Sequence, residues 1–101
     1  MAEARALIVD DDANIRRLLK TILSIRNFKV VEAADGFDAL EKLRDSTFDL
    51  VFSDVSMPAM NGFELLTRIK RSPLTASLPV VMLTSENRPE DIARGKKLGC
   101  S

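Results

Sequence analysis

At 101 residues the chain has room for one small domain and not for a second. Its 15 basic residues balance 15 acidic ones, and this zero net charge argues against binding nucleic acid through bulk charge. The chain has no histidine and a single cysteine, Cys100, which excludes zinc sites, histidine-dependent catalytic triads and an internal disulfide. Any metal bound here must therefore be a hard cation held by oxygen.

Hydropathy and the N-terminal sequence bear on the cellular compartment. No apolar run approaches the roughly 18 to 20 residues that span a bilayer, and residues 1–6 lack the apolar segment of a signal peptide. A lone cysteine suits a reducing environment. We therefore expect a cytoplasmic protein without a membrane partner.

The N-terminal part of the chain begins with a short apolar run, residues 6–9, which is typical of a strand and stops at Asp10. Residues 14–26 then carry apolar side chains at the i, i+3, i+4, i+7 and i+8 spacing of an amphipathic helix. These side chains are Ile15, Leu18, Leu19, Ile22 and Leu23. Residues 28–33 are predicted to form a second strand, and Asp35-Gly36 the turn after it.

The remainder of the chain repeats this alternation. A second helix is predicted from Phe37 to about residue 45, and a third strand over residues 48–52 that runs into Asp54. Residues 63–69 have helical spacing, and residues 79–83 form a fourth apolar run. Pro89 suits the first turn of a last helix that extends to about residue 98, where Gly99 ends it.

Strands that alternate with helices predict βαβ units with right-handed crossovers and a parallel sheet. The strands are nearly continuous apolar runs, as expected when helices cover both faces of the sheet. The sequence therefore predicts an open α/β sandwich.

Polar side chains follow three of the predicted strands at the point where each strand ends. Asp10, Asp11 and Asp12 follow the first strand, Asp54 the third, and Thr84 the fourth. Ligands of open parallel sheets bind at this edge, so we expect at least three carboxylates to meet there, a costly arrangement unless a cation neutralises it. Mg²⁺ is the natural candidate. One acidic or amide side chain, that of Asp12 or Asn14, is also expected to cap the first helix.

The sequence resembles the receiver domains of two-component signalling, in order and along essentially the whole chain. The motifs that carry the resemblance are residues 7–12 (Leu-Ile-Val-Asp-Asp-Asp), residues 52–54 (Phe-Ser-Asp) with Met57-Pro58 and Asn61-Gly62, and residues 81–85 (Val-Met-Leu-Thr-Ser). The resemblance implies a flavodoxin-like open parallel sheet, which in a complete receiver has five strands in the order 2-1-3-4-5.

The resemblance also implies the roles of the residues at the strand ends. Asp54 is expected to accept a phosphoryl group and to be one of the Mg²⁺ ligands. Asp11 is expected to bind Mg²⁺ directly, Asp10 to assist through a coordinated water, and the backbone carbonyl of Ser56 to complete the protein ligands. Thr84 is expected to place its hydroxyl on a phosphoryl oxygen.

The implied partners are proteins. The phosphoryl donor is expected to be a phosphohistidine on a sensor histidine kinase or a phosphotransfer protein, and Ile15 and Arg16 occupy the positions at which receivers meet it. The output partner is not indicated by the sequence. The resemblance implies a signalling domain and not an enzyme, apart from its own phosphorylation and dephosphorylation.

Residues 1–101 are expected to form a single receiver domain that is incomplete at its C-terminus. A complete receiver continues with a fifth strand, which ends in a Lys-Pro pair, and a fifth helix. Lys96 and Lys97 lie inside the last predicted helix and do not match that lysine. We therefore expect a sheet of order 2-1-3-4, slow phosphorylation, and self-association through the open sheet edge and an uncovered apolar patch.

Two alternatives remain open. The chain could be an interaction module that keeps the receiver scaffold and works without phosphorylation. It could also be a phosphatase of the haloacid dehalogenase type, because Asp10-x-Asp12 after a first strand resembles the nucleophile motif of those enzymes. Phosphorylation of Asp10, and not of Asp54, would support the phosphatase.

Overall fold

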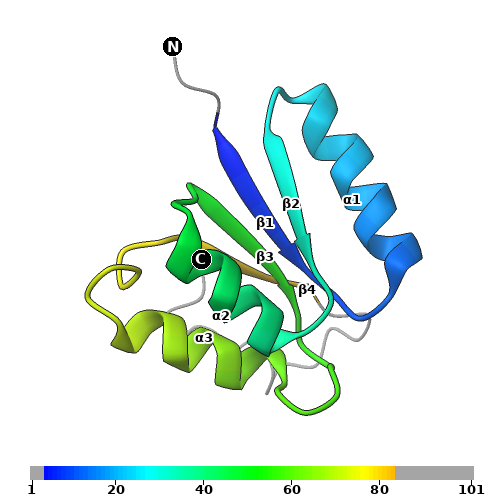
Figure 1. Cartoon of the computed structure of the whole chain (residues 1–101). Helices are drawn as coiled ribbons and strands as arrows, with labels where there is room; N and C mark the ends of the chain where they lie inside the picture. The colour runs from blue at the N-terminus through cyan, green and yellow to red at the C-terminus, as the bar shows by residue number, and fades with distance from the viewer. Residues whose placement is uncertain (1–3, 84–101) are drawn as a thin grey trace.

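The computed structural model describes residues 4–83 as one parallel sheet with helices on both faces (Figure 1). The elements in chain order are β1 (Arg5–Val9), α1 (Ala13–Ile25), β2 (Lys29–Ala33), α2 (Gly36–Asp45), β3 (Leu50–Asp54), α3 (Gly62–Arg71) and β4 (Val80–Leu83). The strands are hydrogen-bonded in the order β2-β1-β3-β4, and each neighbouring pair is parallel. The predicted open α/β sheet of order 2-1-3-4 is thereby confirmed.

The boundaries of the described elements follow the prediction closely, with one shift at β3. This strand begins at Leu50 and not at Phe48. The preceding segment pairs instead with Arg5: the Asp49 carboxylate accepts a hydrogen bond from the Arg5 backbone N–H at 2.8 Å, and the Arg5 guanidinium lies 5.3 Å from the centre of the Phe48 ring. Thr84 lies outside the described residues, and so does the helix predicted over residues 89–98.

Side chains of β1 alternate between two cores. Leu7 and Val9 belong to the larger core, which lies between the sheet and the α2–α3 pair. Ala6 and Ile8 belong to the smaller core beneath α1. Because both faces of this strand are covered, all four side chains are fully buried, which explains why the strand is continuously apolar in sequence.

A polar residue caps the N-terminus of each described helix. The side chain of Asp12 accepts a hydrogen bond from the Asn14 backbone N–H before α1, and Asp35 and Asn61 do the same for Asp38 and Glu64. Such caps satisfy backbone donors that have no partner within the helix. Of the two candidates left open by the sequence, Asp12 is therefore the cap of α1.

One face of α1 is apolar but not covered. The side chains of Ile15, Leu18, Ile22 and Ile25 are 39%, 56%, 48% and 74% exposed, and their spacing puts them in one row along the helix. We call these four residues the α1 stripe. Among the helices of residues 4–83, α1 covers one face of the sheet, next to β1 and β2, while α2 and α3 share the other face (Figure 1). Leu23 is the single buried residue of α1.

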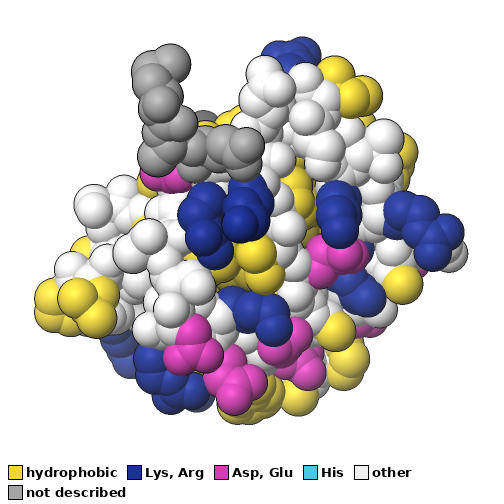
Figure 2. Space-filling view, turned by 45° about the horizontal axis from the view of Figure 1, so that its top comes forward, with side chains coloured by type: hydrophobic (Ala, Val, Ile, Leu, Met, Phe, Trp, Pro, Cys, Tyr) yellow, Lys and Arg dark blue, Asp and Glu magenta, His cyan; other side chains and the backbone are white. Residues whose placement is uncertain are grey.

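The charged side chains of the described surface are mixed in sign. Figure 2 shows Lys and Arg side chains interspersed with Asp and Glu side chains on one face of the molecule. This distribution agrees with the balanced charge of the sequence and differs from the basic surface typical of nucleic-acid binding. Among residues 4–83, no helix combines the length and the apolar character needed to cross a membrane.

Candidate metal and phosphoacceptor site

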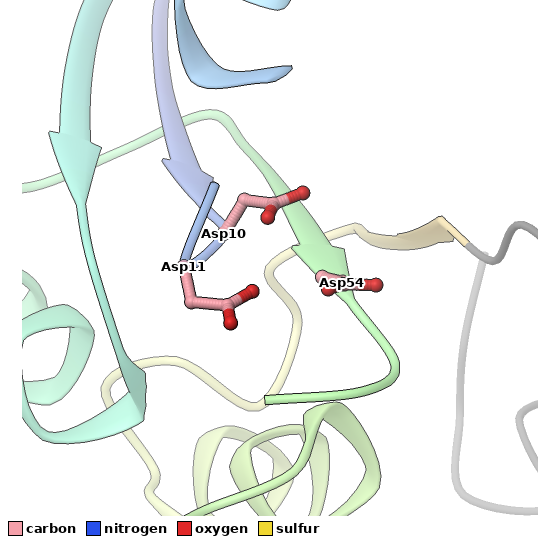
Figure 3. Close-up of side chains that lie close together, drawn as sticks. All are labelled: Asp10, Asp11 and Asp54. Atoms are coloured by element: carbon pink, nitrogen blue, oxygen red, sulfur yellow. The ribbon is translucent and has the colours of Figure 1, made fainter. Parts of the chain in front are cut away.

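Three carboxylates meet where β1 and β3 end. Asp54 is the last residue of β3, and Asp10 and Asp11 directly follow β1. The two strands pair in parallel with Val9 opposite Ser53, so the residues after them emerge side by side. One carboxylate oxygen from each of the three residues lies within 4.8 Å of the other two. Figure 3 shows the three side chains close together at this edge of the sheet. We call this set the acidic cluster.

Burial and mutual repulsion disfavour the charged forms of two members of the acidic cluster. Burial raises the pKa of Asp10, and the negative charges of Asp54, Asp11 and Asp12 raise it further, against a hydrogen bond from the Asp12 backbone that lowers it. Burial also raises the pKa of Asp54, together with the charge of Asp11, while backbone N–H groups of Ser56 and Val55 lower it. A bound cation would relieve both effects.

The donor set of the acidic cluster fits a small hard cation. Mg²⁺ prefers carboxylate and carbonyl oxygens together with water, at about 2.0 to 2.1 Å, so that oxygens on opposite sides of one ion are roughly 4.2 Å apart. The carboxylate oxygens of the acidic cluster, one from each residue, all lie within 4.8 Å of one another, a spacing at which one small ion could be shared by all three residues. With no histidine or cysteine among these ligands, softer metals have no preferred donor.

The loop that follows Asp54 is held against the larger core. Met57 and Met60 are buried there, and the Gly62 backbone N–H closes the loop by donating to the Val55 carbonyl at 2.9 Å. At the tip of the loop, Ala59 has a φ of 67°. This left-handed backbone conformation costs an L-residue with a Cβ roughly 1–2 kcal/mol.

Because of this strain, Ala59→Gly is expected to raise the free energy of unfolding by about 1 kcal/mol. Ala76→Gly is the matched control: Ala76 is also an exposed loop alanine, and its φ is not positive. There the extra freedom of glycine in the unfolded chain should cost about 0.5–1 kcal/mol. Urea unfolding of the three proteins measures both changes, and equal effects of the two substitutions would contradict the strain at Ala59.

The structure brings together some of the residues singled out in the sequence. Asp10, Asp11 and Asp54 form the acidic cluster. Ser56 lies beside it, and its backbone N–H donates to an Asp54 carboxylate oxygen at 3.4 Å. Ile15 is exposed in the first turn of α1. Thr84 lies outside the described residues.

Arg16 differs from its expected place on the surface. Its side chain is 18% exposed, because Nη1 donates to the Asp10 carbonyl at 2.6 Å and Nε donates to a Glu32 carboxylate oxygen at 3.3 Å. Sequence reasoning did not find Glu32, which lies in β2 opposite Ile8 of β1. A single acidic residue in a predicted strand does not by itself indicate a role in a site. The position of Glu32 beside Arg16 follows from the register between β1 and β2.

Carboxylates at the ends of β1 and β3 lie where the strand order of the sheet reverses, the position at which open α/β proteins bind their ligands. The fold and the acidic cluster thus define a doubly wound α/β protein with three carboxylates at the carboxyl edge of its sheet. More particularly, the chain belongs to the response regulator receiver domain family, whose model matches residues 6–101. It is a receiver domain of two-component signalling, a class of signalling domains that are generally not enzymes.

Curated relatives and solved structures agree with this assignment. The chain is 39% identical to the gliding motility regulatory protein of Myxococcus xanthus over 94% of its length, and spans 12% of that protein. It is 36% identical to protein PilG of Pseudomonas aeruginosa and spans 70% of it. The structure of the chemotaxis protein CheY4 of Vibrio cholerae superposes on the chain with a TM-score of 0.94 and 38% sequence identity. The match covers 99% of this chain and 83% of the CheY4 chain.

Proposed function

We propose that the chain is the phosphoacceptor of a two-component phosphorelay and that Asp54 takes the phosphoryl group from a phosphohistidine. The observation that carries the proposal is the approach of Asp10, Asp11 and Asp54 at the ends of β1 and β3. Asp54, the last residue of β3, is partly exposed, whereas Asp10 is only 5% exposed. A phosphoryl donor therefore reaches Asp54 more readily than Asp10.

In the proposed reaction, a carboxylate oxygen of Asp54 forms a bond to phosphorus as the bond between phosphorus and the histidine nitrogen breaks. The nitrogen keeps the electron pair of that bond, and the imidazole leaves after it gains a proton from solvent. Mg²⁺, bound by Asp11, Asp54 and the Ser56 carbonyl with help from Asp10, supplies charge neutralisation. Such transfers need positioning and electrostatic stabilisation more than covalent help.

The proposed role of Thr84 begins once Asp54 is modified. A phosphoryl group adds about 1.5 to 2 negative charges, and the Thr84 hydroxyl, next along the chain after β4, donates to one of its oxygens. A hydroxyl drawn inward in this way changes the surface that an output partner reads. The output partner is a protein, in keeping with the balanced charge of the chain.

The phosphohistidine donor is proposed to contact the N-terminal end of α1, which follows the acidic cluster directly. Ile15 offers an exposed apolar side chain there. Arg16 beside it is mostly covered by its bonds to Asp10 and Glu32, so Ile15 is the main contact. An apolar anchor beside the reacting group positions a partner in the way that buried contacts anchor other interfaces.

The rest of the α1 stripe supports self-association of this chain. Leu18, Ile22 and Ile25 are exposed on consecutive turns, a row that is costly to leave in water. The wild type is expected to elute as a dimer or larger species at high concentration, and Ile22→Asp as a monomer. Phe37→Asp is the matched control, because Phe37 is similarly exposed, at 54%, but lies on α2. A wild type that stays monomeric at all concentrations would contradict this expectation.

The proposed function is tested by intact-mass measurement after incubation with acetyl phosphate, with Mg²⁺ or with a chelator. One phosphoryl group is expected with Mg²⁺ and none with chelator, and peptide mapping should place it on Asp54. A label on Asp10 would instead indicate the phosphatase. A folded protein that takes no label would be a receiver scaffold that acts through binding alone.

A further inference from the structure

Arg16 is tied to the acidic cluster by its position and by two hydrogen bonds. Nη1 of its guanidinium donates to the backbone carbonyl of Asp10 at 2.6 Å, and Nε donates to the Glu32 carboxylate at 3.3 Å. Both bonds involve a charged group, and such bonds are shorter and stronger than neutral ones. Arg17, the next residue, is exposed and carries the same charge. A comparison of Arg16 with Arg17 therefore distinguishes the effect of a guanidinium held by hydrogen bonds from the effect of a positive charge alone.

The carbonyl that Arg16 binds belongs to the peptide between two members of the acidic cluster. This peptide joins Asp10 to Asp11, and a peptide unit is planar. Fixing its carbonyl therefore fixes the direction in which the chain continues to Asp11. The other constraints on Asp10 are a backbone hydrogen bond to the Ala33 carbonyl at 3.2 Å and the bond from the Asp12 N–H to its carboxylate at 2.9 Å. Arg16 is the described side chain that holds the carbonyl itself.

Glu32 holds the guanidinium in turn. It lies in β2, where it pairs with Ile8 of β1, so it is attached to the same rigid sheet as Asp10. Lys20 also approaches Glu32, at 3.8 Å, but its side chain is 53% exposed, and the hydrogen bond to the Asp10 carbonyl comes from Arg16. Two donors in one planar group can reach a carbonyl and a carboxylate together, and a lysine ammonium does not reproduce this geometry.

We propose that Arg16, held by Glu32, is a positioning residue that sets the Asp10–Asp11 peptide for cation binding by the acidic cluster. The proposal rests on the proposed function, since it concerns the same Mg²⁺ site. It assigns Arg16 a role within its own chain, whereas a residue that contacts the donor would act only when a partner protein is present. Partners that orient metal ligands typically change metal affinity about 10- to 100-fold when they are removed.

The test is Mg²⁺ binding by the whole chain, followed by isothermal titration calorimetry, without phosphodonor or partner protein. Arg16→Ala is expected to weaken binding by about ten-fold, Glu32→Gln by less, and Arg16→Lys to restore part of the loss. Arg17→Ala and Lys20→Ala are the controls, expected to stay within about two-fold because neither removes a bond to the Asp10 carbonyl. Amide spectra of the metal-free proteins should show the Asp11 and Asp12 signals displaced in Arg16→Ala and unchanged in Arg17→Ala.

The outcomes separate this proposal from the proposed function. If the wild type binds Mg²⁺ and Arg16→Ala matches Arg17→Ala, the positioning role is overturned while the Mg²⁺ site stands. If the wild type binds no Mg²⁺, the proposed Mg²⁺ site fails, and the positioning role fails with it. If Arg16→Ala does not fold, Glu32→Gln and Arg16→Lys decide, and binding equal to that of the wild type in both overturns the proposal.

Discussion

Asp54→Asn is expected to abolish phosphorylation and, at the same time, to raise the stability of the metal-free protein at pH 7. The loss follows because the amide cannot act as the nucleophile. The gain follows because burial and the charge of Asp11 raise the pKa of Asp54, so that its ionised form destabilises the fold. The gain in the free energy of unfolding should be about 1 kcal/mol or less, since Asp54 is only partly buried and solvent screens its charge.

The pH dependence of this gain has a defined sign. A carboxyl group with a raised pKa binds its proton more tightly in the folded than in the unfolded protein, so its contribution to stability falls as pH rises from its ordinary value of 3.8 through the folded pKa. The advantage of Asp54→Asn should therefore be full at pH 7 and shrink toward pH 4. Urea unfolding in chelator at both pH values measures it.

Glu41→Gln is the control for removal of a negative charge, because Glu41 is exposed on α2 and lies outside the acidic cluster. It should change stability little at either pH. Adding Mg²⁺ should reverse the order, stabilising the wild type more than Asp54→Asn, because the ligand binds the folded state. A metal-free Asp54→Asn protein that is less stable than the wild type at pH 7 would show that the carboxylate is favourably solvated or paired.

The meeting of Asp10, Asp11 and Asp54 could be predicted because strand geometry leaves little choice. The apolar runs of β1 and β3 both end at aspartates, and parallel neighbours end at the same edge of a sheet. The amphipathic spacing of α1 was less informative. It predicts an apolar face, but not which element covers it, and of the five side chains that define the pattern only Leu23 is buried. The contacts that α1 makes with β1 and β2 cover part of that face and leave the α1 stripe exposed.

The bonds of Arg16 could not be predicted, for a different reason. In sequence, Arg16 is one of several basic residues on α1, and such residues usually lie on a solvated face. Its contact with Glu32 depends on the register that places Glu32 beside Ile8, and register is a property of strand pairing. The three carboxylates of the acidic cluster can thus be predicted from the sequence, whereas the residues that surround them can be identified only in the three-dimensional structure.

Gly62→Ala is expected to lower the free energy of unfolding by about 3 kcal/mol, the upper part of the range for overpacking, and to weaken Mg²⁺ binding. Gly62 is buried at the start of α3, and a Cβ there would overlap the backbone carbonyl oxygen of Asp54 and approach the Met82 Cε to 2.6 Å. A backbone atom at the end of β3 cannot move without moving Asp54 itself. Urea unfolding and calorimetric Mg²⁺ titration measure the two effects.

Gly36→Ala is the matched control, because Gly36 is also buried and is also the first residue of a helix behind a capping side chain. A Cβ at Gly36 would meet the Met60 Sδ at 2.6 Å and the Met60 Cβ and Cγ at 3.0 Å. All three atoms belong to one methionine side chain, which is flexible enough to adjust. This variant should stay within about 1 kcal/mol of the wild type and keep its Mg²⁺ affinity. The difference in unfolding free energy and in Mg²⁺ affinity between the two variants then measures how rigidly the end of β3 holds Asp54. Equal losses in the two variants would mean that the backbone at Asp54 moves as easily as the Met60 side chain.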